Sequence, residues 1–179
     1  DAHYAFINYA SALVADALFF NSRYHLQAFQ HALPGFLKTF PDHNELQSLA
    51  GIAAKSRVLP LGLDLARLDR LRPTQDGHSR QVPLILWNHR WEYDKNPAEF
   101  FRVLLQLAAE GLEFEVAVLG EAYRSQPAIF AEARQMLGHR LIHFGYIEGL
   151  EEYAGGLWRA DILPVHSFHD FFGARVGQA

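Results

Sequence analysis

Two cations, Arg90 and Lys95, are the residues best placed to do chemistry in this sequence. They follow an apolar run at residues 82–87, which is typical of a buried strand. Because open α/β sheets bind ligands at the carboxyl ends of their strands, we expect both side chains at a binding edge. An arginine fork and a lysine point charge suit a pyrophosphate, and they would neutralise charge that develops on a leaving diphosphate. Surface ion pairs with Glu92 or Asp94 are an equally good interpretation of the same spacing.

A second candidate is the segment 169–173, His-Asp-Phe-Phe-Gly, which follows an apolar run at residues 162–165. Asp170 could accept hydrogen bonds from sugar hydroxyls. Gly173 permits a close backbone approach and opens a predicted helix, whose N-terminal amides can bind an anion. The alternative is a helix-capping aspartate followed by two phenylalanines of the core.

Other chemistries find little support in the sequence. The ten histidines include two close pairs, His139 with His143 and His166 with His169. Neither pair shares a helix with a third, acidic ligand, as a zinc motif requires. No Gly-x-Gly-x-x-Gly turn follows the 82–87 run, which disfavours a nicotinamide cofactor, and no serine or cysteine occupies a nucleophile elbow. We therefore expect neither a metal nor a bound cofactor.

From residue 82 onward, strands and helices alternate. Apolar runs predict strands at residues 82–87, 114–119, 141–144 and 162–165, and helical spacing predicts helices at 97–110, 127–137 and 150–159. Asn96, Pro97 and Glu99 have the spacing of a capping box at the start of the first of these helices. Alternation with short connections predicts a parallel sheet of right-handed βαβ units with flanking helices, a Rossmann-like α/β fold. Trp87 and Trp91 are better explained as packing residues than as stacking platforms.

The chain before residue 82 predicts a separate partial domain. Helices are expected at residues 3–16, 21–33 and 45–54, and strands at 17–20 and 57–59. Asn21 or Ser22 would cap the second helix, and Pro34-Gly35 would end it. Residues 65–81 hold four arginines among turn-forming and polar residues: Arg67, Arg70, Arg72 and Arg80. We interpret this stretch as an exposed linker between domains 1–64 and 82–179, in preference to a patch for an anionic partner.

The composition excludes several classes of protein. Half of the 179 residues are hydrophobic, which is enough for a sizeable core. Sixteen Lys and Arg against 20 Asp and Glu give a net charge of −4, so this piece as a whole lacks a nucleic-acid footprint. Cysteine is absent, which fits a reducing compartment such as the cytoplasm. No apolar run reaches the length of a membrane-spanning helix, so we expect no membrane as a partner. Since the chain starts at Asp1 and stops at Ala179 within a predicted helix start, we expect a piece of a longer protein.

Several of these features together resemble the donor-binding domain of retaining GT-B glycosyltransferases. They are Arg90 with Lys95, Gly120 after the second strand, Gly145 after the third, and the acidic-Phe-Phe-Gly loop after the fourth. Residues 60–64, Pro-Leu-Gly-Leu-Asp, resemble the Pro-x-Gly-hydrophobic-Asp crossing between the two domains of such enzymes. More specifically, segments 13–22, 87–97, 118–121 and 169–173 are similar to the tRNA-queuosine mannosyltransferase group.

This resemblance implies a metal-independent transfer of a hexose with retention, from a nucleotide sugar that would be GDP-mannose to queuosine in tRNA. Arg90 and Lys95 would hold the donor diphosphate, and Asp170 would bind hydroxyls of the hexose. Gln178 would face the ribose of the nucleotide, and main chain near Tyr146 and Ile147 would border the base. The donor-binding positions that the resemblance implies are Gly120, Tyr146, Ile147, His169, Phe172, Gly173 and Gln178.

The sequence also departs from the family pattern. The family has two glutamates separated by seven residues, where this chain has Asp170 and Gln178. The first is one methylene shorter and the second is uncharged, so a non-catalytic nucleotide-sugar binding module stays open as an alternative. A transferase that acts on a lipid or a glycan is another. Because the Gly-rich loop of the acceptor domain and the closing C-terminal segment are not among these residues, we expect turnover from the full protein and not from this piece.

Overall fold

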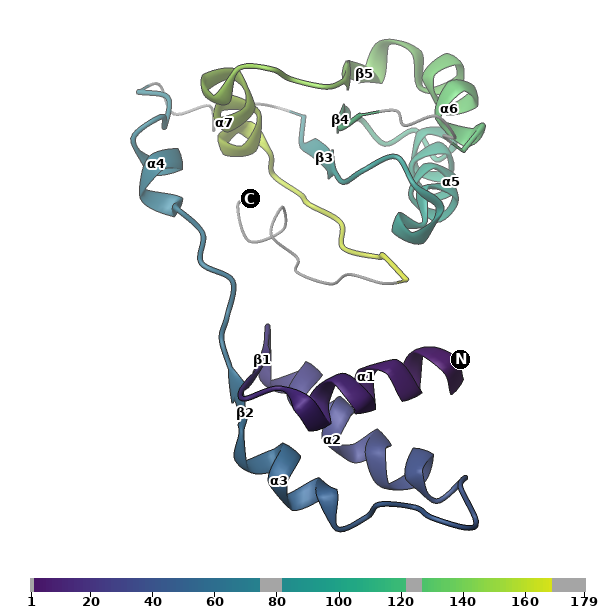
Figure 1. Ribbon diagram of the computed structural model, residues 1–179. Helices are drawn as coiled ribbons and strands as arrows, with labels where there is room; N and C mark the ends of the chain where they lie inside the picture. Colours follow the sequence, from purple (N-terminus) through teal and green to yellow (C-terminus); the bar gives the residue numbers. More distant parts are fainter. Residues whose placement is uncertain (1, 75–81, 122–126, 169–179) are drawn as a thin grey trace. The chain divides into compact units, whose positions relative to one another are not determined.

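The computed structural model describes residues 2–74, 82–121 and 127–168, and the chain divides into two units, Asp1–Gly62 and Leu63–Ala179 (Figure 1). Both units are α/β, and each strand pair in the described residues is parallel. The predicted fold class, parallel sheets with flanking helices, is therefore confirmed. No helix in those ranges is both long enough and apolar enough to span a bilayer.

The first unit packs three helices with a two-stranded sheet. Its elements are α1 (Ala2–Val14), β1 (Leu18–Phe20), α2 (Arg23–Leu37), α3 (Ser48–Ala54) and β2 (Ser56–Val58). Its buried core comprises Tyr9, Ala12, Leu33, Leu37 and Ile52. Ser22 is the N-cap of α2, as predicted, because its hydroxyl accepts a hydrogen bond from the backbone N–H of His25 at 3.1 Å. Each of these elements was predicted with somewhat different ends.

Helix α2 does not end at Pro34-Gly35, and that prediction is wrong. The helix continues to Leu37, and the carbonyl of Pro34 accepts a hydrogen bond from the backbone N–H of Lys38 at 3.2 Å. A proline inside a helix costs about 3 kcal/mol. Leu33 and Leu37 lie on either side of it and are both buried in the core, each stabilising the fold by about 1.5–3 kcal/mol. Burial of the two leucines therefore offsets the cost of the proline.

The second unit contains a three-stranded parallel sheet in the order β3-β4-β5. Its elements are α4 (Leu65–Asp69), β3 (Leu84–Asn88), the 3-10 turn η2 (Tyr93–Lys95), α5 (Pro97–Ala109), β4 (Glu115–Leu119), α6 (Ile129–Leu137), the 3-10 turn η3 (Gly138–Arg140), β5 (Leu141–Gly145) and α7 (Leu150–Arg159). The three strands and the three long helices confirm the alternation that the sequence predicts.

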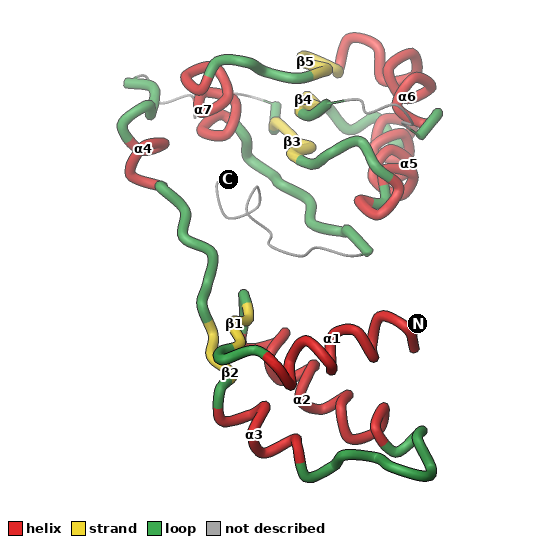
Figure 2. Tube along the Cα trace, viewed as in Figure 1, coloured by secondary structure: helices red, strands yellow, loops and turns green. Residues whose placement is uncertain are grey.

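The fourth predicted strand, residues 162–165, is not a regular strand, and Figure 2 draws residues 160–168 as loop. A single parallel bridge joins Ile162 to Ile85, with the N–H of Leu86 donating to the carbonyl of Ile162 at 2.8 Å. Pro164 follows two residues later and has no N–H to extend the ladder. The bridge still places this segment on the far side of β3 from β4. The strand order thus extends to both sides of β3, as in a doubly wound sheet, whose ligand crevice lies at that switch point.

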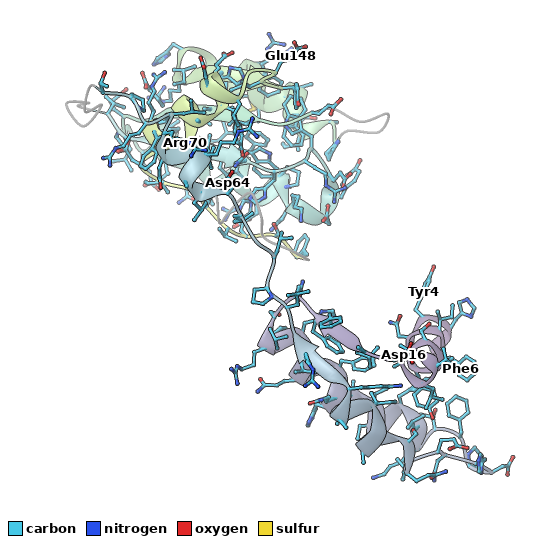
Figure 3. The ribbon with its side chains drawn as sticks, turned by 60° about the vertical axis from the view of Figure 1, so that its left-hand side comes forward. Tyr4, Phe6, Asp16, Asp64, Arg70 and Glu148 are labelled. Atoms are coloured by element: carbon cyan, nitrogen blue, oxygen red, sulfur yellow. The ribbon has the colours of Figure 1, made fainter. Side chains whose placement is uncertain are left out.

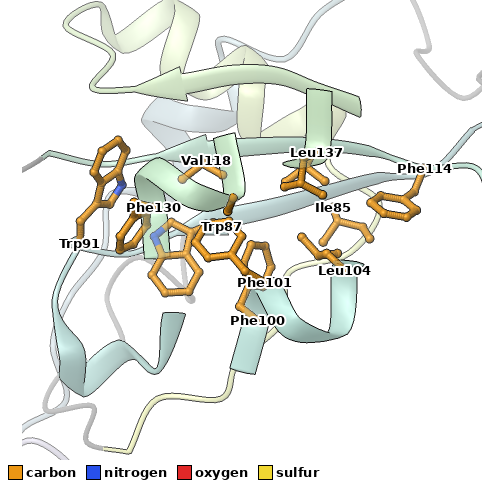
Figure 4. Packing of buried hydrophobic residues seen from close by; sticks show 12 residues of the cluster. Ile85, Trp87, Trp91, Phe100, Phe101, Leu104, Phe114, Val118, Phe130 and Leu137 are labelled. Atoms are coloured by element: carbon orange, nitrogen blue, oxygen red, sulfur yellow. The ribbon is translucent and has the colours of Figure 1, made fainter. Parts of the chain in front are cut away.

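Helices cover both faces of this sheet. On one face, Trp87 of β3 packs with Phe101 of α5 and Phe130 of α6 (Figure 4). Trp91 stacks on Phe130 with ring centroids 4.7 Å apart, so the packing interpretation of both tryptophans is confirmed. The cluster on the other face contains Leu68, Leu84, Leu86, Ala117, Leu119, Ala154 and Leu157. This second cluster joins α4 and α7 to the sheet.

Residues 65–72 are part of the second unit and not an exposed linker, which corrects the sequence interpretation. Leu68 of α4 is buried, and its carbonyl accepts a hydrogen bond from Nε1 of Trp158 at 3.0 Å. The guanidinium of Arg72 lies 4.7 Å from the centre of the Trp158 ring. Local sequence patterns do not predict this helix, because one buried leucine among polar residues does not establish an amphipathic helix. Residues 75–81, with Arg80, lie outside the described residues.

Candidate functional site

A pocket of about 300 Å³ opens at the carboxyl ends of β3, β4 and β5. It is lined by Asn88, Leu119, Gly120, Tyr146, Ile147, Glu148, Gly149, Leu150 and Tyr153. The strands supply its inner wall, and the β5–α7 loop with the first turn of α7 supplies the rest. Three predicted donor-binding residues, Gly120, Tyr146 and Ile147, therefore meet at one place. This is the edge at which parallel α/β sheets bind ligands.

The inner wall of the pocket carries a polar pair that the sequence analysis did not assign. Asn88 has no exposed surface, and its Nδ2 donates to the hydroxyl oxygen of Tyr153 at 2.9 Å. The Tyr153 hydroxyl lies 3.3 Å from Oδ1 of Asn88, so both groups of the amide face it. Leu84, Leu86 and Asn88 alternate along β3, so the asparagine lies on the same face of the sheet as the two leucines, the face that α7 covers. This alternation was the signal in the sequence. The tyrosine, 65 residues away, could only be matched to it by the fold.

Gly120 shapes the edge of this pocket through its backbone. Its φ of +129° lies in the region that favours glycine. A Cβ at this position would fall well inside contact distance of the carbonyl oxygen of His89 and 2.9 Å from Nε1 of Trp91. The same tryptophan nitrogen donates to the carbonyl of Leu119 at 3.3 Å. Gly120 therefore lets the loop after β3 lie directly against the end of β4.

Arg90 and Lys95 are not among the residues that line the pocket, although their loop adjoins it through His89 and Trp91. Arg90 is exposed and forms a two-point ion pair with Glu92, with nitrogen–oxygen distances of 3.0 and 3.1 Å. Lys95 is largely buried, and its Nζ lies 3.2 Å from Oδ2 of Asp94. The ion pairs of the alternative interpretation thus both form.

The predicted capping box at the start of α5 is wrong, although Pro97 is the first residue of the helix as expected. Asn96 is left-handed, with a φ of 54°, and its side chain caps nothing in the helix. Its carbonyl oxygen instead lies 3.1 Å from Nε2 of His166. Glu99 forms an ion pair with Arg102 at 2.6 Å, and the hydrogen bond from Arg102 lowers the pKa of the Glu99 carboxyl. Contacts to the 166–168 segment determine this turn in place of local capping.

The segment that follows the Ile162 bridge contacts the loop between β3 and α5, residues 89–96, which carries Arg90 and Lys95. The N–H of Phe168 donates to the carbonyl of Asp94 at 2.9 Å, inside the turn that carries Lys95. The ring of His166 lies against Trp87 and Phe100, with centroids 5.7 Å apart in each case. These contacts bring two loops about 70 residues apart in sequence to one edge of the sheet. The predicted site residues His169, Asp170, Phe172, Gly173 and Gln178 lie outside the described residues.

The described residues contain no group of three or more His, Cys, Asp or Glu side chains placed to hold a metal ion. The candidate site comprises a glycine turn, two tyrosines, an amide, a carboxylate and, on the neighbouring loop, two cations. These groups can bind, orient and stabilise charge. Such a set suits a ligand with an anionic part and a neutral hydrogen-bonding part.

Comparison with known proteins identifies the relatives of this chain. A family model described as tRNA-queuosine alpha-mannosyltransferase N-terminal matches residues 1–63, which differs by one residue from the end of the first unit. The tRNA-queuosine alpha-mannosyltransferase of Drosophila melanogaster is 31% identical over 184 residues, an alignment that covers 100% of this chain and 48% of the relative. The chain is related to the tRNA-queuosine alpha-mannosyltransferase family. It spans about half the length of that curated relative.

Two solved structures share the fold of the chain. One, described as trehalose-6-phosphate from E. coli bound with UDP-2-fluoro glucose, has a TM-score of 0.60 at 14% identity and covers 89% of this chain and 41% of its own. A glycosyltransferase from Rickettsia africae has a TM-score of 0.51 at 15% identity and covers 78% of this chain and 41% of its own. The chain is thus related to the queuosine mannosyltransferases. Its structure is GT-B-like, as the resemblance implied.

Proposed function

We propose that the intact protein is a retaining glycosyltransferase that moves mannose from GDP-mannose to queuosine in tRNA, in the cytoplasm and without a metal. The observation that carries the proposal is the relationship to the Drosophila tRNA-queuosine alpha-mannosyltransferase, which extends over all of this chain. The pocket at the strand ends and the adjoining loop of cations support a nucleotide-sugar site in the second unit. On this proposal, residues 1–64 belong to the acceptor domain and residues from 82 onward to the donor domain.

The donor would be divided between two parts of the site. Arg90 and Lys95 would hold the diphosphate, and main chain near Tyr146 and Ile147 would border the base. Asp170 would bind hydroxyls of the hexose and Gln178 those of the ribose. The remaining donor contacts would come from the position after β4 and from the loop after residue 168, at Gly120, His169, Phe172 and Gly173.

The ion pairs of the two cations are compatible with this role. An exposed ion pair such as Arg90 with Glu92 contributes less than about 1 kcal/mol, because water screens it and two side chains must be ordered. A diphosphate offers a stronger, charge-assisted partner for the same guanidinium. Lys95 differs, since burial and the turn Tyr93–Lys95 fix its position. On this proposal, Arg90 would exchange Glu92 for the diphosphate when the donor binds, whereas Lys95 is in position before the donor binds.

The reaction would proceed on one face of the sugar. The hydroxyl oxygen of the acceptor would bond to the anomeric carbon on the side from which the diphosphate leaves, so the configuration is retained. The electron pair of the breaking carbon–oxygen bond would pass to the diphosphate, which would also take the proton of the acceptor hydroxyl. Arg90 and Lys95 would stabilise the charge that develops on this leaving group.

Donor binding by charge-neutralising variants tests these roles. In the intact protein, Arg90→Ala and Lys95→Ala should each weaken GDP-mannose binding by about 1.5–3 kcal/mol, because each removes a charge-assisted contact. Titration calorimetry measures the change. Arg102→Ala is the matched control, since Arg102 is also exposed and also paired with a glutamate, but on the outer surface of α5. Unchanged donor affinity in both Arg90→Ala and Lys95→Ala would contradict the phosphate role.

A second candidate function rests on one observation. Asp170 and Gln178 stand where the family has two glutamates, so the protein could bind a nucleotide sugar without transferring it. The two functions differ in turnover. GDP-mannose that binds tightly to the intact protein but is neither transferred nor hydrolysed would favour the binding module over the transferase.

A further inference from the structure

The pocket at the strand ends has an unusual charge for a nucleotide site. Among the described residues that line it, Glu148 is the one charged side chain, and neither lysine nor arginine is present. The other polar side chains are those of Asn88, Tyr146 and Tyr153. A carboxylate repels a diphosphate, so this pocket does not suit the phosphates of the donor. It suits a neutral group that presents hydrogen-bond donors. The hydroxyls of the hexose and the ribose are assigned above to Asp170 and Gln178, which leaves the base for this pocket.

We propose that Glu148 selects guanine, an inference that rests on the proposed nucleotide-sugar function. An ionised carboxylate offers two acceptor oxygens and no donor. Guanine presents two adjacent donors, N1–H and the N2 amino group, along one edge. Adenine has an acceptor nitrogen next to its amino group, and uracil has a single N–H between two carbonyl oxygens. Guanine therefore satisfies both oxygens, whereas the other bases bring an acceptor against a negative charge.

The local structure leaves Glu148 available for this task. It lies in the loop between the end of β5 at Gly145 and the start of α7 at Leu150. Its side chain is exposed (Figure 3). Among the described residues, none forms an ion pair or a hydrogen bond with this side chain. Glu151 and Glu152 already place negative charge in the first turn of α7, where the helix dipole favours it. The beginning of the helix therefore does not by itself require a carboxylate at position 148.

A neighbouring ring completes the recognition. Tyr146 lines the same pocket, and 61% of the residue is exposed, so its ring is accessible to a base. Bases stack on exposed aromatic side chains with little preference between them. Stacking on Tyr146 would bind any nucleotide, and hydrogen bonding to Glu148 would distinguish guanine from the rest.

Binding of four nucleoside diphosphates to the intact protein tests the inference by calorimetry. We expect GDP to bind more tightly than ADP or UDP. Inosine diphosphate lacks only the N2 amino group and should bind about tenfold more weakly than GDP, since one charge-assisted hydrogen bond is lost. In Glu148→Gln the ratio of GDP to inosine diphosphate affinity should fall close to one. Glu152→Gln, a carboxylate of the adjoining helical turn outside the pocket, should keep the wild-type ratio.

The possible failures are distinguishable. If ADP or UDP binds as tightly as GDP, or if Glu148→Gln keeps the wild-type ratio, the role of Glu148 is overturned while the nucleotide-sugar function stands. If none of the four diphosphates binds, both the inference and the proposed function fail.

Discussion

Gly120 connects the two halves of the candidate site at the scale of single residues. Its left-handed backbone and the lack of a side chain allow the loop with the cations to pack on the end of β4, beside the pocket. The family resemblance implies a donor-binding role for Gly120, and the structure adds a packing requirement that is independent of any ligand.

Substitution of Gly120 should therefore impair folding as well as binding. Gly120→Ala should lower the free energy of unfolding by about 2 kcal/mol or more, because it combines a strained φ with a clash against His89. Urea denaturation measures the change. Gly155→Ala is the control, since Gly155 lies within α7 with open space around it, and it should stabilise the protein by about 0.5–1 kcal/mol. A Gly120→Ala variant as stable as the wild type would show that the loop does not depend on this contact.

The sequence predicted part of the candidate site and missed part of it. Arg90 and Lys95 were found because charge after an apolar run is a local pattern, and their ion pairs with Glu92 and Asp94 lie within the same few residues. The Asn88–Tyr153 pair was not found, since its two residues meet only when α7 packs on the sheet. Local spacing predicts which loop carries chemistry, whereas long-range register decides which side chains face it.

At the scale of elements, α4 is a helix that tertiary contacts stabilise although its local sequence hardly predicts it. Five helical residues would not be stable in isolation, because the first turn of a helix is costly to form. Burial of Leu68 and the hydrogen bond from Trp158 stabilise this helix on the second unit. The capping box failed for a related reason, since Asn96 makes its contacts with His166, 70 residues away. Tertiary contacts override local propensity at both places.

Two leucines of α4, one buried and one exposed, distinguish the contribution of packing to stability from that of helix propensity. Leu68→Ala should lower the free energy of unfolding of the second unit by about 2–3 kcal/mol, because it removes a buried side chain from the cluster beneath α7. Leu65→Ala changes an exposed position of the same helix and should alter it by less than about 0.5 kcal/mol. Chemical denaturation followed by tryptophan fluorescence reports on this unit. Equal effects from the two substitutions would mean that α4 is not anchored through Leu68.

At the scale of the whole molecule, the chain has two units with separate cores. The family model matches the first unit, and the candidate donor site lies in the second. The overall α/β fold was predictable from the alternation of apolar runs. The sequence placed the end of the first domain at residue 64, two residues beyond the first unit. It also predicted a linker at residues 65–81, of which residues 65–72 pack on the second unit.

The transfer of labelled mannose tests the central claim most directly. The intact protein would be incubated with GDP-mannose that carries a labelled sugar, and with tRNA that either contains queuosine or lacks it. We expect label in the queuosine-containing tRNA alone, and loss of that label in Lys95→Ala but not in Arg102→Ala. No label in queuosine-containing tRNA, together with labelling of a lipid or glycan in the same assay, would contradict the proposed function.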